Sequence, residues 1–307
     1  MTSHQGTLLK AVACSLTGIF LLDCMGLLVK LLVDVYPAQE LAVWRNAFGM
    51  IPSLIVLSFA PGWTWRREKI LFPRHRLALL RGLFITVAQT SFYFSLSFMQ
   101  FATASALTFT MSLFVTALSG PVLGNKVGPW RWGAVLIGFS GMMWILKPGG
   151  EAFSIAALLP VCAALFYALT TVTAQLFPSE VPTPAINLLT NITALLGAAV
   201  LTLCTTGFIP IASWTDMGLI AAMGMFGGCG VLLLIFAYRI TEPSNLSPFD
   251  YVGILFAFAL GWLFFGEAPV DELFPGVIFI VAGGLVILWR ERVNAARTTA
   301  PIEEPAE

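Results

Sequence analysis

Long apolar segments follow one another along almost the whole chain, and only short polar stretches separate them. Each segment has about 20 residues, the length that an α-helix needs to cross the hydrocarbon core of a bilayer. The predicted segments are residues 11–33, 40–60, 77–98, 101–123, 130–147, 153–176, 184–206, 215–239, 244–265 and 272–289. The pattern predicts an all-α integral membrane protein with ten transmembrane helices.

The second half of the chain repeats sparse landmarks of the first half. The residues Pro37, Asn46, Gly124, Gly133 and Gly141 recur 142 to 145 positions later as Pro182, Asn191, Gly266, Gly276 and Gly284. Each copy holds five segments, and an odd number of crossings makes the second copy enter the bilayer from the opposite side. We therefore predict two inverted five-helix repeats over residues 1–147 and 148–292, an arrangement typical of secondary transporters. Residues 293–307 are predicted to form a disordered cytoplasmic tail.

Composition and charge support the membrane assignment and give an orientation. Apolar residues make up 58% of the chain and charged residues 10%, whereas a soluble domain has about 25% charged residues. With the N-terminus in the cytoplasm, 13 of the 16 Lys and Arg residues fall on the inner side, and only Lys147 falls outside. Positive residues are retained on the cytoplasmic side. We therefore expect both termini on the cytoplasmic side of the membrane.

Several function classes lack the residues that they need. No GxxxxGK[ST] loop is present, which argues against ATP hydrolysis. Both histidines lie in polar segments, and the five cysteines lie in apolar segments without CxxC spacing. We expect no catalytic residue, no metal site and no cofactor, and a membrane-embedded enzyme is the less favoured alternative.

Three ionisable residues occur inside the first two segments, where charge is costly. Asp23 lies near the middle of the first segment. It is either a protonated carboxyl that bonds a neighbouring helix or a site for a proton or a cationic substrate. Lys30 and Arg45 lie closer to the outer surface, where they either extend to the headgroups or act in charge coupling.

Asp250 gives the strongest single indication of a functional site. It stands in the string Ser247-Pro248-Phe249-Asp250-Tyr251, inside the ninth segment. Pro248 cannot donate a backbone hydrogen bond, so the helix should bend beside a carboxylate and a phenol. Polar breaks of this kind are tolerated where they line a cavity. We favour this role for Asp250, as a substrate or coupling residue, over a purely structural hydrogen bond.

Further polar side chains on the predicted helices are candidates for substrate binding. Those with the matching spacing or chemistry are Gln89, Tyr93, Tyr167, Asn187 and Asn191, together with Asp250 and Tyr251. The amides and phenols either cross-link helices or bind solute. Serine and threonine residues along segment 101–123 are interpreted as helix-packing contacts, the more frequent role for such a stripe.

Local strings in this order and spacing resemble one known family. They are Met25 to Lys30, Trp44-Arg45, Leu80 to Leu83, Ala102 to Ala106, Ser247 to Tyr251 and Gly261 to Glu267. Together they are similar to the EamA family of the drug/metabolite transporter superfamily, over residues 8–292. The resemblance implies ten helices around a central cavity, lined mainly by spans 1, 3, 4, 6, 8 and 9, with alternating access. Those strings look closest to bacterial uptake proteins for riboflavin and S-adenosylmethionine, in which an acidic residue often stands where this chain has Gly26.

These observations lead to one functional expectation with two alternatives. We expect a secondary transporter of a small polar or aromatic metabolite, of the riboflavin or S-adenosylmethionine uptake type. An exporter of amino acids or related metabolites is the first alternative, because the family also holds such proteins. The expected partners are a small-molecule metabolite and the lipid bilayer, with no nucleic acid, and a homodimer is left open.

Overall fold

The computed structural model of the protein describes residues 2–59, 74–124, 128–146, 155–178, 181, 183–240, 246, 249, 251–267 and 270–298. These residues form helices, turns and short connections, and no β-strand occurs among them. The prediction of an all-α protein is therefore confirmed.

The described helices follow the predicted apolar segments closely. In chain order they are α1 (Thr2–Leu32), α2 (Ala38–Ser58), α4 (His75–Ser95), α5 (Phe101–Thr108), α6 (Met111–Leu123), α7 (Pro129–Leu146), the 3₁₀ turn η1 (Ile155–Ala157), α8 (Leu158–Ala174), α9 (Thr183–Thr205), α10 (Trp214–Ile240), α12 (Val252–Phe265), α13 (Val270–Leu273) and α14 (Gly276–Thr298). Within this part of the chain, seven apolar helices are long enough to cross a bilayer, and three shorter ones lie in the remaining predicted segments. The protein is a multi-pass membrane protein.

The segment predicted as one helix over 101–123 is interrupted. Helix α5 ends at Thr108 and α6 begins at Met111, with Phe109 and Thr110 in a turn between them. Side-chain hydroxyls bond the carbonyls around this break, as in the bond of 2.6 Å from Thr110 Oγ1 to the Leu107 carbonyl. Such local bonds compete with the helical pattern and bend it. The predicted span is present, since Phe101–Leu123 is apolar and long enough to cross a bilayer, but the turn inside it was not predicted, because hydropathy alone does not report a break.

The serine and threonine residues of this segment mostly bond back to their own helix. Thr108 Oγ1 donates to the carbonyl of Ala104 at 2.9 Å, and Thr116 Oγ1 donates to that of Ser112 at 3.2 Å. These bonds stay within one helix, so the predicted role of the stripe in packing between helices remains a prediction.

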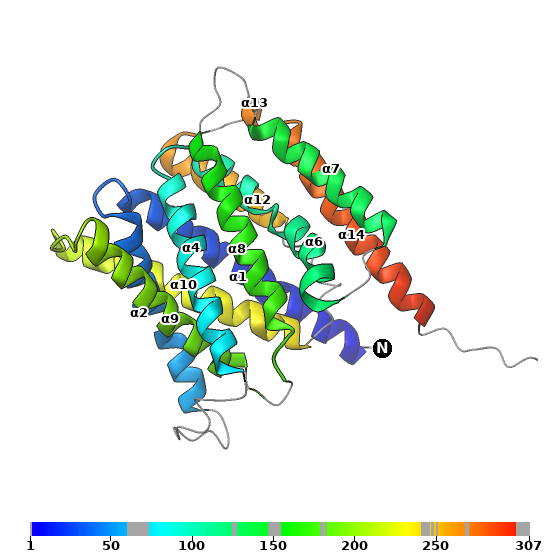
Figure 1. Ribbon diagram of the computed structural model, residues 1–307, viewed down its shortest axis with the longest axis horizontal. Helices are drawn as coiled ribbons and strands as arrows, with labels where there is room; N and C mark the ends of the chain where they lie inside the picture. Colours follow the sequence, from blue (N-terminus) through cyan, green and yellow to red (C-terminus); the bar gives the residue numbers. More distant parts are fainter. Residues whose placement is uncertain are drawn as a thin grey trace, which may run out of the picture.

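The helices pack in a consistent set of neighbours. Helix α1 lies against α10, and α4 lies against α8; α2 contacts both α9 and α10, and α4 also contacts α9. Figure 1 shows α7 and α14 side by side along one edge of the molecule, where they contact each other extensively. Helices from the first and second halves of the chain are thus interleaved throughout the bundle.

Glycines allow these helices to approach one another at the backbone. A Cβ built on Gly18 of α1 would lie 2.9 Å from the Gly230 carbonyl oxygen of α10, and a Cβ on Gly230 would lie 2.9 Å from the Gly18 carbonyl oxygen. A Cβ on Gly276 of α14 would similarly lie 2.7 Å from the Gly141 carbonyl oxygen of α7. Small residues at such positions are typical of membrane helix interfaces.

The connection between α9 and α10 is tied to the beginning of α2. Tyr36 Oη donates to Asp216 Oδ2 at 2.8 Å and accepts from the Ala212 N–H at 2.9 Å. The fully buried Glu40 accepts from the Ile209 N–H at 3.1 Å. These bonds fix this end of α2 against the second half of the chain.

One of the two predicted domain boundaries lies beside a helix end, whereas the other lies within α14, which continues through residues 293–298 of the predicted tail. Helix α7 ends at Leu146, next to the predicted boundary at residue 147. Helix α14 runs to Thr298, past the predicted boundary at residue 292, and residues 299–307 lie outside the described residues.

Candidate functional site

A buried polar cluster joins α2 to α4 in the interior of the bundle. Arg45 and Asn46 lie two turns into α2, and Gln89 lies on α4. Asn46 Nδ2 donates to Gln89 Oε1 at 2.9 Å, Gln89 Nε2 donates to Asn46 Oδ1 at 3.3 Å, and Arg45 Nη1 donates to the same Oδ1 at 3.1 Å. The exposed fractions are 7% for Arg45, 0% for Asn46 and 3% for Gln89. Each amide satisfies the other, as buried polar groups require.

Two tyrosines lie next to this cluster. Tyr93, one turn after Gln89 on α4, is fully buried, with its Oη 3.9 Å from the Met25 sulfur of α1. Tyr167 of α8 packs against the same apolar core as Met25 and Tyr93. Both phenols interact electrostatically with the Arg45 guanidinium. The structure therefore brings together three predicted substrate residues, Gln89, Tyr93 and Tyr167, with the predicted coupling residue Arg45.

The other predicted substrate residues lie elsewhere or are not described. Asn187 and Asn191 are half-buried on α9 and take no part in this hydrogen-bonded cluster. Tyr251 lies beside α6, with its Oη 3.2 Å from Ser112 Oγ, and its hydroxyl occupies the space where a side chain at Gly284 would begin. Asp250 falls outside the described residues, so its predicted role stays a prediction.

Asp23 occupies a separate position between α1 and α12. Its Oδ2 is buried and has no hydrogen-bond partner, and a Cβ on Gly253 of α12 would lie 3.4 Å from that oxygen. Gly26, one turn later on α1, faces Phe101, whose ring would be 2.8 Å from a Cβ at position 26. An acidic side chain at position 26 would therefore require Phe101 to move. Asp23 is the carboxyl that this part of α1 offers instead.

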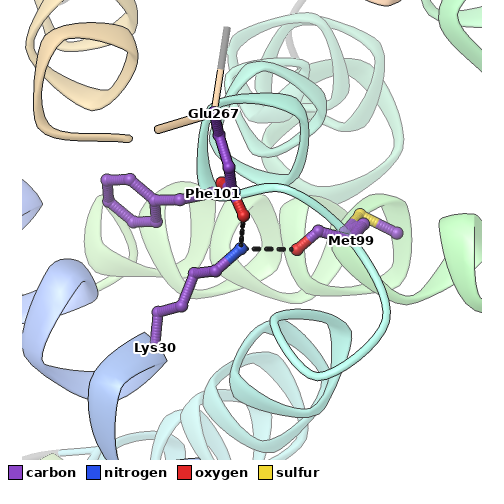
Figure 2. Close-up of polar contacts among 4 residues, drawn as sticks. All are labelled: Lys30, Met99, Phe101 and Glu267. Carbon is purple, nitrogen blue, oxygen red and sulfur yellow. Dashed lines mark hydrogen bonds and ion pairs between the residues drawn. The ribbon is translucent and has the colours of Figure 1, made fainter. Parts of the chain in front are cut away.

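Lys30 belongs to an ion pair at the end of α1. Its Nζ lies 2.6 Å from Glu267 Oε1 and donates to the Met99 carbonyl at 3.0 Å, while Glu267 Oε2 accepts from the Phe101 N–H at 3.0 Å. Figure 2 shows the ammonium directed at both oxygens. The Nζ also lies 5.1 Å from the centre of the Phe265 ring. The pair is mostly shielded, with exposed fractions of 12% and 19% for the two side chains.

This ion pair joins three parts of the chain that are distant in sequence. Lys30 ends α1, Met99 and Phe101 flank the start of α5, and Glu267 follows α12. The sequence placed Lys30 near the outer surface but gave no partner for it. In the sequence, Glu267 was named only as the end of the string Gly261 to Glu267, and Asn46 only as a residue repeated in the second half. Neither was assigned to the site, because contacts between distant segments leave no local pattern.

The described residues do not suggest a metal centre or a catalytic group. No set of three His, Cys, Asp or Glu residues is positioned for a metal ion in this part of the chain. All five cysteines are free thiols. The chemistry available is that of binding, namely one guanidinium, two amides and two phenols.

Curated relatives of this chain are membrane transporters from bacteria. The riboflavin transporter of Rhizobium johnstonii is 28% identical over 264 residues, covering 83% of this chain and 82% of the relative. The S-adenosylmethionine uptake transporter of Rickettsia felis is 25% identical and covers 94% and 97% of the two chains. The pseudopaline exporter CntI of Pseudomonas aeruginosa is 25% identical and covers 92% and 93%.

A solved structure and a family model also match this chain. A crystal structure at 18% sequence identity superposes with a TM-score of 0.63 and covers 94% of this chain and 99% of its own. The sequence model of the EamA-like transporter family matches twice, over residues 9–147 and 154–289. The relatives are named as transporters and not as enzymes. The chain therefore belongs to the EamA-like transporter family of the drug/metabolite transporter superfamily.

Proposed function

We propose that this protein is a secondary transporter that carries a small polar or aromatic metabolite across the bacterial inner membrane by alternating access. The substrate would bind where Arg45, Gln89, Tyr93 and Tyr167 meet. Riboflavin-type and S-adenosylmethionine-type compounds are the first candidates, because two of the relatives are named for these substrates.

The buried polar cluster is the observation that carries this proposal. A guanidinium inside a membrane domain is costly and is normally retained for function. Here it lies with two amides and two phenols contributed by α2, α4 and α8. Phenol and amide groups supply the few directed polar contacts that orient a ligand among apolar surroundings.

The packing of the helices supports two inverted repeats. We pair each helix of the first half with one of the second half: α1 with α8, α2 with α9, and α4 with α10. The contact of α1 with α10 then has its counterpart in the contact of α8 with α4. In the same way, the contact of α2 with α10 has its counterpart in the contact of α9 with α4. The family match over two separate ranges is also expected of a duplicated unit. Transporters with such repeats bind substrate between the halves.

The ion pair at Lys30 supports a closed outer side in this conformation. With the N-terminus inside, α1 ends and α5 begins at the outer surface. The bonds among Lys30, Met99 and Glu267 would then close the outer ends of α1, α5 and α12 over the cluster. Opening toward the outside requires that these bonds separate, as alternating access demands.

Flux through proteoliposomes tests the proposal. Purified protein in sealed liposomes should move at least one compound of a metabolite panel that includes riboflavin and S-adenosylmethionine, without altering it chemically. Gln89→Met should slow this flux by about tenfold if the amide contributes about 1.4 kcal/mol to the transport barrier. Gln175→Met, at an exposed position after α8, is the matched control and should retain normal flux. Absence of flux for every compound, or chemical turnover of one of them, would contradict the proposal.

Export is the second candidate direction. The likeness to a pseudopaline exporter over most of both chains favours it. Liposomes loaded with substrate on either side, in a fixed ion gradient, distinguish the two directions by the sign of the net flux.

A further inference from the structure

Arg45 carries a buried charge that no acidic side chain of the described residues neutralises. Among the described residues, the ion pair is formed by Lys30 and Glu267, and Arg45 takes no part in it. The guanidinium is 7% exposed, it donates through Nη1 to a neutral amide, and its Nε is buried without a partner. Among the described residues, only neutral dipoles therefore balance its charge.

An uncompensated buried charge destabilises a protein by several kcal/mol. Helix packing alone does not need a guanidinium here, because the reciprocal bonds between Asn46 and Gln89 already join α2 to α4. Such a charge is retained when something else binds it. The group that binds a positive charge of this kind is an anion.

The free edge of the guanidinium has the geometry for an oxyanion. Nη1 is occupied by Asn46, so Nε and Nη2 are the pair that remains. Two parallel N–H groups match the two oxygens of a carboxylate or phosphate. Gly227 of α10 faces this edge, since a Cβ there would lie 2.9 Å from Nε and 3.2 Å from Nη2. The Met25 sulfur would lie 2.7 Å from the same Cβ, so this edge is closely packed, and an oxyanion reaches the two nitrogens only when α10 and Met25 move away from Arg45.

We infer that Arg45 is an anion-recognition site, and that the transported metabolite carries a carboxylate or phosphate group that pairs with its Nε and Nη2. This inference rests on the proposed transport function and specifies its substrate class. The phenols of Tyr93 and Tyr167 lie within electrostatic reach of the same guanidinium. They would contact the aromatic or polar remainder of the solute, so that the anionic group fixes its orientation.

The test compares compounds that differ only in the anionic group. Thermal unfolding of the purified full-length protein is measured with benzoate and benzamide, N-acetylphenylalanine and N-acetylphenylalaninamide, and flavin mononucleotide and riboflavin. The acid of at least one pair should stabilise the wild-type protein at a concentration about tenfold lower than its neutral partner, since hydrogen bonds to charged groups contribute about 1.5–3 kcal/mol. The first two pairs report carboxylate recognition, and the third reports phosphate recognition.

Variants assign the preference to Arg45. Arg45→Gln should bind the acid and its neutral partner equally, and Arg45→Lys should retain part of the preference. Arg81→Gln is the matched control, because Arg81 is also buried and its Nε also has no partner, but its guanidinium lies over the Phe177 ring, away from the Asn46–Gln89 cluster. Without ligand, the Arg45→Gln protein should unfold at the same or a higher temperature than wild type, because the substitution removes an uncompensated buried charge. If Arg45 had only a structural role, the substitution would lower the unfolding temperature.

The comparison of an acid with its neutral partner needs only the wild-type protein. It therefore tests for recognition of an anion even if Arg45→Gln fails to fold. Equal stabilisation by acids and their neutral partners, or no stabilisation by any acid, overturns the inference. A preference that persists in Arg45→Gln also overturns it. If proteoliposomes then still carry a neutral compound, the transport function stands without the anion site, whereas loss of all flux removes the transport function itself.

Discussion

Lys30 Nζ lies 2.6 Å from Glu267 Oε1, so the last turn of α1 is joined to a residue 237 positions further along the chain. The carboxylate also accepts from the Phe101 N–H at the start of α5. One acidic side chain therefore connects the ends of α1, α5 and α12, and its removal should loosen all three.

Glu267→Gln should increase the access of outside reagents to the interior. The change keeps the size of the side chain and removes the ion pair. In a cysteine-free background, Ala104→Cys reports access, because Ala104 is fully buried in α5. Its labelling by an impermeant thiol reagent should become about fivefold faster for each 1 kcal/mol lost from the closed conformation.

Two further variants control this experiment. Asp271→Asn neutralises an exposed acid on α13 and should leave the labelling rate unchanged. Exchanging the charges in Lys30→Glu with Glu267→Lys should restore slow labelling. An unchanged rate in Glu267→Gln would show that the pair does not hold the outer side closed.

Gly284→Ala should destabilise the protein by displacing Tyr251. A methyl group at position 284 would occupy the same space as the Tyr251 hydroxyl. Such overpacking typically costs about 1–3 kcal/mol, seen as a lower midpoint of thermal unfolding. Gly133→Ala is the matched control, since nothing lies within 4 Å of a Cβ at that helical position. It should be neutral or stabilising by up to about 1 kcal/mol, because alanine favours a helix over glycine.

The sequence predicts the apolar helices well because hydropathy is a local property. The predicted segment 40–60 corresponds to α2 over Ala38–Ser58, and segment 184–206 corresponds to α9 over Thr183–Thr205. The break after Thr108 was missed, since hydroxyl groups that bond nearby carbonyls do not change the hydropathy.

The candidate site was only partly predictable, because its contacts join distant segments. Gln89 and Tyr93 share a helix face, and their spacing identified them. Their association with Arg45 depends on how α2 packs against α4, which no short pattern encodes. Spacing likewise grouped Asn187 with Asn191 but gave no information on which helix they would face.

The orientation predicted from the basic residues is open to direct measurement. Asp34, exposed in the turn after α1, should lie outside, and Gly62 should lie in the cytoplasm. Single cysteines at these positions in intact cells should be labelled and shielded, respectively, by an impermeant reagent. The reverse result would mean that the chain crosses the membrane in the opposite direction.

Asp23→Asn tests the coupling role of Asp23. Its unpartnered, buried Oδ2 makes it the best placed described carboxyl on α1 to exchange a proton during transport. The amide should abolish accumulation driven by a proton gradient and leave substrate exchange between two equal pools intact. Equal loss of both activities would assign Asp23 to folding or to substrate contact instead.

Asp250→Asn is predicted from the sequence alone. Removing the ionisable group while keeping its shape should reduce transport by at least about tenfold, which corresponds to about 1.4 kcal/mol. Membrane levels of the variant should equal those of the wild type, measured by quantitative immunoblot. Wild-type transport by this variant would falsify an ionised role for Asp250.

The pairing of α7 with α14 has a mechanical consequence. A Cβ on Gly283 would lie 2.7 Å from the Ala134 carbonyl oxygen, so the two helices touch backbone to backbone here as they do at Gly276. At Gly283 the three atoms nearest to this Cβ all belong to the α7 backbone, which cannot rotate aside as a flexible side chain can. The two helices should therefore act as a rigid strut at the edge of the bundle (Figure 1), one from each half of the chain. If the protein transports a solute as proposed, the helices around Arg45 should rock against this strut during each transport cycle.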